Sequence, residues 1–92
     1  MNNLKPTARE VRVILNSIGL RDPKYIFNDK RVNGGRIKLW GYEMSLVDQS
    51  RLRVMLQTLF PNLLESIQVE SWGNRGPNGR FEKDTVIKWS NQ

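Results

Sequence analysis

The amino-acid sequence predicts an α+β fold, with four antiparallel strands in one sheet and two helices packed on one face of that sheet. Apolar residues recur at helical spacing in two stretches, residues 8–18 and 49–60. Each stretch is followed by two short segments of strand-like composition, with turn residues between them. The expected order of elements is therefore α-β-β-α-β-β, in a single domain spanning residues 1–92. With both helices on one face, the opposite face is left for solvent or for a partner.

The two helical stretches resemble each other at a distance of 41 residues. Val11–Ile18 aligns with Leu52–Leu59, and the aligned residues keep their chemical character throughout. Three of the aligned pairs are identical, namely Arg12 and Arg53, Val13 and Val54, and Leu15 and Leu56. We therefore expect an internal duplication, with repeat-like units at about residues 7–42 and 48–90.

The first helix is expected to run from Ala8 to Ile18. Thr7 fits the N-cap position, and Glu10, three residues later, completes a capping box. Gly19 fits the position after the helix, where a positive φ angle costs little only for glycine. The residues predicted to face the core are Ala8, Val11, Ile14, Leu15 and Ile18.

A β-hairpin should follow this helix. Its first strand begins at Tyr25, and Asn33-Gly34 is typical of a type I′ turn. The returning strand, Arg36–Trp40, alternates between polar and apolar residues. Ile37 and Leu39 should therefore face the core.

The second unit is expected to repeat this order. Asp48 is the predicted N-cap of a helix over residues 49–60. Its predicted core-facing residues are Leu52, Met55, Leu56 and Leu59. Strands at Ser66–Trp72 and Thr85–Trp89 complete the sheet, and the second of them echoes the returning strand of the first hairpin. The glycine-rich loop between them, Gly73–Arg80, should have no regular structure.

The composition restricts the kinds of chemistry that the chain can perform. The net charge is +6, from 15 basic and 9 acidic residues, which suits RNA, DNA, a ribonucleoprotein or another acidic surface as a partner. A charge of this size is also common among small soluble domains. There is no cysteine and no histidine, so disulfides and the commonest general base and metal ligand are excluded. Neither a secretion signal nor a transmembrane stretch is recognisable, so we expect a cytoplasmic protein.

No set of residues typical of catalysis is recognisable, and we expect neither an enzyme nor a bound cofactor or small-molecule substrate. The glycines at Asn33-Gly34-Gly35 are too few for a phosphate-binding loop. Glu70, Glu82 and Asp84 could meet across the second hairpin and hold a divalent metal, as in nucleases. The simpler interpretation is that these carboxylates are solvated, so the expected metal content is none.

A group of basic and aromatic residues is the best candidate for a binding site. A two-residue turn at Asn33-Gly34 would place Phe27 opposite Trp40, and Arg31 opposite Arg36, on the sheet face away from the helices. Cations there could contact phosphates, while the rings could stack on unpaired bases. The candidate residues are Phe27, Arg31, Arg36, Lys38 and Trp40, with Arg75 and Arg80 from the second hairpin loop. The alternative is that the rings belong to the core and the basic residues are an ordinary surface.

The length of 92 residues and the opening stretch Met1–Val11 resemble those of phage anti-CRISPR proteins of the type I-F group. The resemblance implies a non-catalytic inhibitor in the host cytoplasm. Such an inhibitor binds the crRNA-guided surveillance complex, called Csy or type I-F Cascade, and blocks pairing of guide RNA with target DNA. It would dock on the backbone subunits of that complex and could touch the guide RNA. The charge of +6 argues against mimicry of DNA.

Other functions remain open at this point. A small RNA- or DNA-binding regulator would use the same basic and aromatic residues and would bind bare nucleic acid with a steep salt dependence. A structural adaptor would use the open sheet face or an edge strand to contact another protein. A metal-dependent nuclease would require the acidic residues of the second hairpin.

Overall fold

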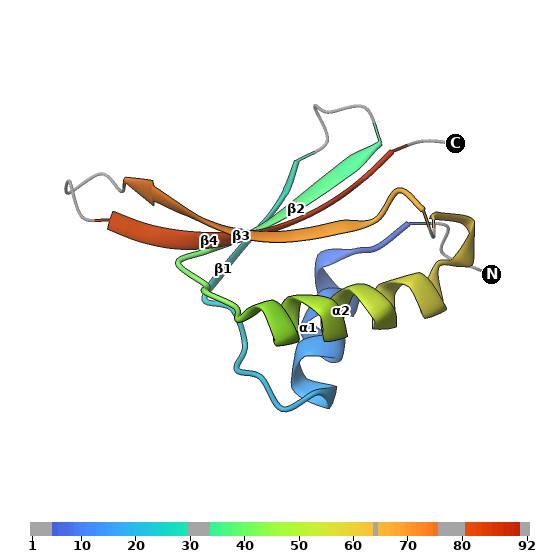
Figure 1. Cartoon of the computed structure of the whole chain (residues 1–92), viewed down its shortest axis with the longest axis horizontal. Helices are drawn as coiled ribbons and strands as arrows, with labels where there is room; N and C mark the ends of the chain where they lie inside the picture. Colours follow the sequence, from blue (N-terminus) through green and yellow to red (C-terminus); the bar gives the residue numbers. More distant parts are fainter. Residues whose placement is uncertain (1–4, 30–33, 64, 76–80, 91–92) are drawn as a thin grey trace.

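A computed structural model describes residues 5–29, 34–63, 65–75 and 81–90. Its elements in chain order are α1 (Ala8–Ser17), β1 (Tyr25–Asp29), β2 (Gly35–Trp40), α2 (Leu46–Leu59), the 3-10 helix η1 (Pro61–Leu63), β3 (Gln68–Arg75) and β4 (Phe81–Trp89). The predicted α+β order is confirmed, and both helices lie on the same side of the sheet (Figure 1). Within these ranges, no helix combines the length and the apolar character needed to cross a bilayer.

The four strands form one antiparallel sheet in the order β1-β2-β4-β3. The two hairpins therefore meet at β2 and β4 in the centre, and β1 and β3 are the edges. Exchanging the two αββ units gives the same order in reverse, which is the arrangement expected of two related units. The duplication itself stays a prediction.

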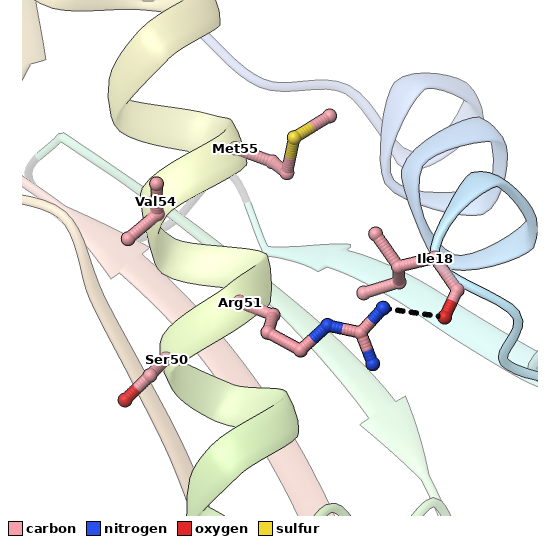
Figure 2. Close-up of a pocket in the computed structure, with 5 residues that line it drawn as sticks. All are labelled: Ile18, Ser50, Arg51, Val54 and Met55. Atoms are coloured by element: carbon pink, nitrogen blue, oxygen red, sulfur yellow. Dashed lines mark hydrogen bonds between the residues drawn. The ribbon is translucent and has the colours of Figure 1, made fainter.

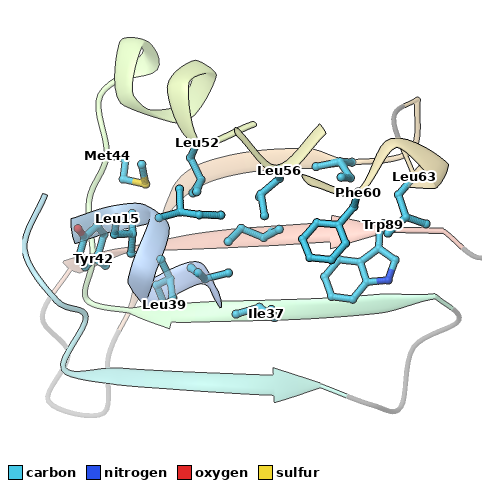
Figure 3. Packing of buried hydrophobic residues seen from close by; sticks show 14 residues of the cluster. Leu15, Ile37, Leu39, Tyr42, Met44, Leu52, Leu56, Phe60, Leu63 and Trp89 are labelled. Carbon is cyan, nitrogen blue, oxygen red and sulfur yellow. The ribbon is translucent and has the colours of Figure 1, made fainter. Parts of the chain in front are cut away.

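One hydrophobic cluster fills the space between the helices and the sheet (Figure 3). Ile37 and Leu39 of β2 point toward the helices, as predicted, because alternate side chains of a strand share a face. Ile87 and Trp89 of β4 do the same. The helices contribute Val11, Ile14, Leu15, Leu52 and Leu56. Burial of each such side chain stabilises the fold by about 1.5–3 kcal/mol.

The start of α1 is confirmed. The Thr7 hydroxyl accepts a hydrogen bond from the backbone N–H of Glu10 at 3.3 Å and donates one to its carboxylate at 2.8 Å. The helix ends at Ser17, one residue earlier than expected, and Gly19 has a φ angle of 82°. Of the predicted core-facing residues, Ala8 and Ile18 are only partly buried.

The predicted start of α2 is wrong, because Asp48 is not the N-cap. The helix begins at Leu46, and the Ser45 hydroxyl accepts a hydrogen bond from the backbone N–H of Asp48 at 3.1 Å. The extra turn contains Leu46 and Val47, whose side chains are exposed. Because these two residues do not face the core, the periodic pattern of apolar residues gives no indication of this turn.

The predicted core-facing side of α2 is wrong at its C-terminal end. Leu52 and Leu56 are fully buried and Met55 is partly buried, but Leu59 is 52% exposed. Phe60 is buried instead. At Phe60 the backbone leaves the helical conformation, with φ −127° and ψ 67°, so its ring contacts the core from outside the helical register.

The second hairpin is longer than predicted. β3 begins at Gln68 rather than Ser66 and continues to Arg75, while β4 begins at Phe81 rather than Thr85. The expectation of irregular structure from Gly73 onward is therefore wrong for its first three residues. Their backbones pair with β4 up to Arg75 opposite Phe81, and backbone hydrogen bonds require no particular side chain.

The proposed correspondence between β2 and β4 is also wrong in phase. An offset of 49 residues equates Trp40 with Trp89. Trp40 is 51% exposed, whereas Trp89 is buried between the sheet and the helices. The β2–β4 register decides the phase: it pairs Gly35 with Trp89 and Ile37 with Ile87, so Trp89 shares the core face with Ile37, whereas Trp40 lies on the other face.

Candidate functional site

The sheet face opposite the helices, here called the open face, carries the candidate binding residues. Phe27, Arg36, Lys38 and Trp40 all lie on it, since Ile37 and Leu39 between them are buried in the core. The prediction that these side chains share one face is therefore confirmed. The described side chains of the open face are Tyr25 and Phe27 (β1), Arg36, Lys38 and Trp40 (β2), Asp84, Val86 and Lys88 (β4), and Gln68, Glu70 and Trp72 (β3).

The predicted register of the first hairpin is wrong by two residues. Tyr25, not Phe27, lies opposite Trp40, and Phe27 lies opposite Lys38. Asp29, not Arg31, is paired with Arg36. A shift of two residues keeps every side chain on its predicted face, because the period of a strand is two.

Gly34 lies close to the end of β4, and its contacts explain why glycine occupies this position. Its φ angle is 93°, and a Cβ atom at this position would overlap the backbone of Trp89. Gly34 therefore lies against the end of β4, where only a residue without a side chain fits. The glycine that favours a tight turn in the sequence is required by this close approach of two strands.

Four aromatic side chains are exposed on the open face. Trp40 and Phe27 are the two that the sequence analysis identified, and they are exposed rather than part of the core. Tyr25 and Trp72 are two that it missed. Tyr25 lies opposite Trp40, and Trp72 lies opposite Asp84, so Tyr25, Trp40 and Trp72 form an aromatic row across the sheet, with Asp84 between the two tryptophans. Phe27 lies beside this row, two residues along β1 and opposite Lys38. Alternation in β3 could have placed Trp72 there, because Val69 points to the core.

Charges of both signs occur on the open face. The Lys38 ammonium lies 5.0 Å from the centre of the Trp40 ring and 3.5 Å from a carboxylate oxygen of Asp84. Asp84 is buried and also accepts a hydrogen bond from the backbone N–H of Gly41 at 2.8 Å. Lys88 similarly lies 3.5 Å from the carboxylate of Glu70. The described face is therefore more nearly neutral than the sequence suggested.

The structure does not describe the side chains of the remaining candidate residues. Arg31 and Arg80 lie outside the described residues. Arg75 is the last residue of β3, and its side chain is not among those described. Of the three acidic residues considered as metal ligands, Asp84 and Glu70 contact lysines, and the side chain of Glu82 is not among those described. No cluster of three metal-ligating side chains occurs in the described part of the chain.

A pocket of about 250 Å³ lies at the end of the open face where β1 begins and β2 ends. Its lining residues, which define the corner pocket, are Arg21, Lys24, Tyr25, Trp40 and Gly41. Among the described residues, the lining of this pocket contains no carboxylate. Sequence analysis missed this pocket because Arg21 and Lys24 belong to the connection before β1, outside any regular element.

The side chain of Arg21 is held in place at this pocket. Its guanidinium lies 4.4 Å from the centre of the Tyr42 ring and donates a hydrogen bond to the carbonyl of Gly41 at 3.4 Å. The Tyr42 hydroxyl donates to the backbone carbonyl of Arg21 at 2.6 Å. Burial disfavours the phenolate and raises the pKa of Tyr42.

A second hollow lies on the helix side of the molecule, between the end of α1 and the middle of α2 (Figure 2). Its volume is about 350 Å³, and it is lined by Ile18, Ser50, Arg51, Val54 and Met55. Arg51 donates a hydrogen bond to the carbonyl of Ile18 at 2.9 Å, which caps the C-terminal end of α1 with a positive charge. The lining is mostly hydrocarbon, and Arg51 is engaged in this contact. We therefore assign the groove a structural role.

Comparison with protein-family models, with curated proteins and with solved structures gave no match. The function must accordingly be inferred from the two sheet-side features, the exposed aromatic row and the corner pocket.

Proposed function

We propose that this protein is a non-catalytic inhibitor that binds a crRNA-guided type I-F surveillance complex in the host cytoplasm and blocks pairing of guide RNA with target DNA. The observation that carries the proposal is the open face, where four exposed aromatic side chains lie among lysine and arginine residues. This arrangement supports contact with unpaired nucleotides. The choice of this particular ribonucleoprotein comes from the resemblance of residues 1–11 to type I-F anti-CRISPR proteins.

Exposed rings suit an unpaired strand because each base has two faces on which an aromatic side chain can stack. Such stacking contributes roughly 1–3 kcal/mol per base and tolerates any sequence. A guide RNA that must pair with target DNA carries unpaired bases before that pairing occurs. A protein that covers these bases, or the path of the incoming strand, competes directly with the target.

The charge pattern supports a contact that combines nucleic acid and protein. The net charge of +6 favours approach to RNA, but Asp84 and Glu70 compensate lysines on the open face itself. Binding through phosphates alone would be weakened by these carboxylates. An interface in which the rings contact bases, and the polar groups contact protein, uses every part of the described face.

The proposal is tested by titrating the protein against a purified type I-F surveillance complex and measuring target-DNA binding. We expect inhibition at a ratio near one protein per binding site. Phe27→Ala and Trp40→Ala should each raise the inhibitory concentration at least about tenfold, the loss expected for one stacking contact. Leu59→Ala is the matched control, because Leu59 is equally exposed but lies on α2, on the other side of the molecule.

Two results would contradict the proposal in different ways. Absence of any effect on target binding at saturating protein would exclude the inhibitor function. Full inhibition by both ring variants would exclude the open face as the contact surface.

An RNA- or DNA-binding regulator is the second candidate, because the two cations and two rings of the corner pocket would serve it as well as they serve the inhibitor. This function predicts saturable binding to a bare single strand that weakens steeply with salt. The inhibitor instead predicts much tighter binding to the assembled ribonucleoprotein than to its isolated RNA. Measuring both affinities at one salt concentration distinguishes the two functions.

A further inference from the structure

The corner pocket combines two rings and two cations at one end of the open face. Tyr25 and Trp40 lie directly opposite each other in the β1–β2 ladder, and both side chains are at least half exposed. Opposite residues on an antiparallel pair have Cβ atoms about 4.5–5.5 Å apart, so the two side chains start from adjacent positions. Together they provide an apolar surface broad enough for one planar ring system.

The pocket differs from the rest of the open face in its electrostatics. Lys38 and Lys88 each lie beside a carboxylate, whereas the residues that line the corner pocket include none. Arg21 and Lys24 therefore contribute two positive charges to the described lining, and the anion next to it is Asp84, which accepts the hydrogen bond from Gly41 and is shared with Lys38. An anionic ligand group would be attracted to this end of the face more strongly than to its centre.

The pocket is also organised before any ligand binds. Arg21 is fixed by the Tyr42 ring and by the Gly41 carbonyl, and Gly41 is itself fixed by Asp84. The ammonium of Lys38 lies over the Trp40 ring, 5.0 Å from its centre. Groups that are already held in position lose little conformational entropy on binding.

We propose that the corner pocket binds one unpaired nucleotide of a single strand. Its base stacks against Trp40 and Tyr25, and its phosphate contacts Arg21 and Lys24. The proposal rests on the proposed function, in which a strand contacts the open face, and it identifies the end at which that strand is anchored. The volume of about 250 Å³ lies below the roughly 300–1,000 Å³ of pockets for drug-sized ligands, which fits a single base.

A nucleotide explains more of the pocket than an acidic peptide does. A carboxylate or phosphate group on a peptide would satisfy the two cations but would leave the rings exposed. A purely apolar ligand would contact the rings but would provide no negative charge for Arg21 and Lys24. A nucleotide carries a planar aromatic group and an anion on the same unit, as the pocket requires.

The test is titration of the full chain with an eight-nucleotide oligouridylate and, in a parallel arm, an oligothymidylate, followed by ¹H–¹⁵N spectra. The chain has three indole N–H groups, at Trp40, Trp72 and Trp89. We expect the Trp40 signal and the backbone signals around Lys24 to shift and saturate. The Trp89 signal should remain unchanged, and because Trp89 is buried it also reports that each variant is folded. The two arms show whether RNA or DNA is preferred.

Matched variants locate the contact. Trp40→Ala and the double variant Arg21→Gln with Lys24→Gln should each weaken oligonucleotide binding at least about tenfold. Trp72→Ala should weaken it less than about threefold, although Trp72 is as exposed as Trp40 on the same face. Lys24→Gln alone should weaken binding measurably, and it removes no hydrogen bond or ion pair to another described residue.

Three outcomes would overturn the proposal. Binding that shifts Trp72 but not Trp40, or that depends equally on both, overturns the corner pocket and leaves the wider open face in place. Absence of saturable binding in both arms also overturns it. The proposed function is judged separately, by inhibition of the surveillance complex, so the two can fail independently.

Discussion

The carboxylate of Asp84 accepts a hydrogen bond from the backbone N–H of Gly41 at a distance of 2.8 Å. This contact joins the middle of β4 to the residue that follows β2, where the φ angle is 61° and glycine is favoured. The other carboxylate oxygen lies 3.5 Å from the ammonium of Lys38. One buried carboxylate therefore fixes the end of β2 beside Trp40 and compensates a cation of the open face.

Replacement of Asp84 should separate these two roles. Asp84→Ala leaves the Gly41 N–H without its acceptor and should lower the free energy of unfolding by about 1–3 kcal/mol. Asp84→Asn keeps an oxygen acceptor and should cost less. Because Asp84→Asn also removes a negative charge, it should bind a single-stranded oligonucleotide more tightly than wild type at low salt. Denaturant unfolding and oligonucleotide titration measure the two effects. Equal destabilisation by both variants would contradict the assigned hydrogen bond.

Trp40 and Trp89 end the two central strands, β2 and β4, but their replacement by alanine should change the stability of the protein by very different amounts. Trp89→Ala removes a buried ring and should cost about 3–5 kcal/mol of stability. Trp40→Ala removes an exposed ring and should change stability by less than about 1 kcal/mol, while weakening binding to the proposed partner. Thermal unfolding compares the two variants directly. Similar losses of stability would mean that both rings belong to the core.

The two leucines near the end of α2 test its boundary with the core. Leu56→Ala should cost about 2–5 kcal/mol, because Leu56 is fully buried. Leu59→Ala should cost less than about 1 kcal/mol, because half of its side chain is already exposed. Denaturant midpoints at an unchanged m-value provide the measurement. A large loss of stability in Leu59→Ala would mean that Leu59 packs against the core, as the sequence pattern predicts.

The buried hydroxyl of Tyr42 should make stability fall at high pH. Burial raises the pKa of Tyr42 above its ordinary value of 10.0, so the folded state holds this proton more tightly than the unfolded state does. Its stabilising contribution is therefore complete below about pH 10 and is lost as the pH rises through the pKa of the folded state.

Comparison with Tyr42→Phe isolates this effect, since every other titrating group is shared. At neutral pH the variant should be less stable by about 0.5–1.5 kcal/mol, because it lacks the hydrogen bond to the Arg21 carbonyl. The difference should shrink as the pH rises above about 10. Unfolding curves at a series of pH values test this, and a difference that stays constant would argue against the proposed titration.

The element order and most of the core were predictable because both depend on the spacing of apolar residues. Val11, Leu15, Leu52 and Leu56 are all fully buried, as helical periodicity requires. The predictions were wrong where the structure depends on something other than the burial of apolar side chains, such as a helix cap. Leu46 extends α2 through a capping serine, without any help from the core.

The phase of β4 could not be read from its sequence. Val86 and Ile87 are both buried, but only Ile87 belongs to the core cluster. Val86 is on the open face and is covered there by neighbouring side chains. Val86 lies between the charged residues Asp84 and Lys88 on the open face, so the adjacent apolar pair Val86 and Ile87 interrupts the alternation, and the supposed echo of Arg36–Trp40 assigned the wrong phase.

The candidate site was predictable in part. Alternation in β2 correctly grouped Arg36, Lys38 and Trp40 on one face. Their surroundings were not accessible to the same argument, because Asp84 reaches Lys38 from a strand more than forty residues later. The corner pocket likewise depends on tertiary placement of Lys24, whose position no local pattern specifies.

The pairing of β2 with β4 has a consequence for how the chain folds. In the described structure it is the only ladder that joins the two halves, and it pairs Gly35 with Trp89, 54 positions later. Each hairpin closes a much shorter loop and should form first, because closure entropy rises with loop length. We therefore expect the docking of the two hairpins to limit the folding rate. Substitutions at Ile37 or Ile87 should then slow folding itself, whereas those at the sheet edges should mainly accelerate unfolding, as measured by folding and unfolding rates in denaturant.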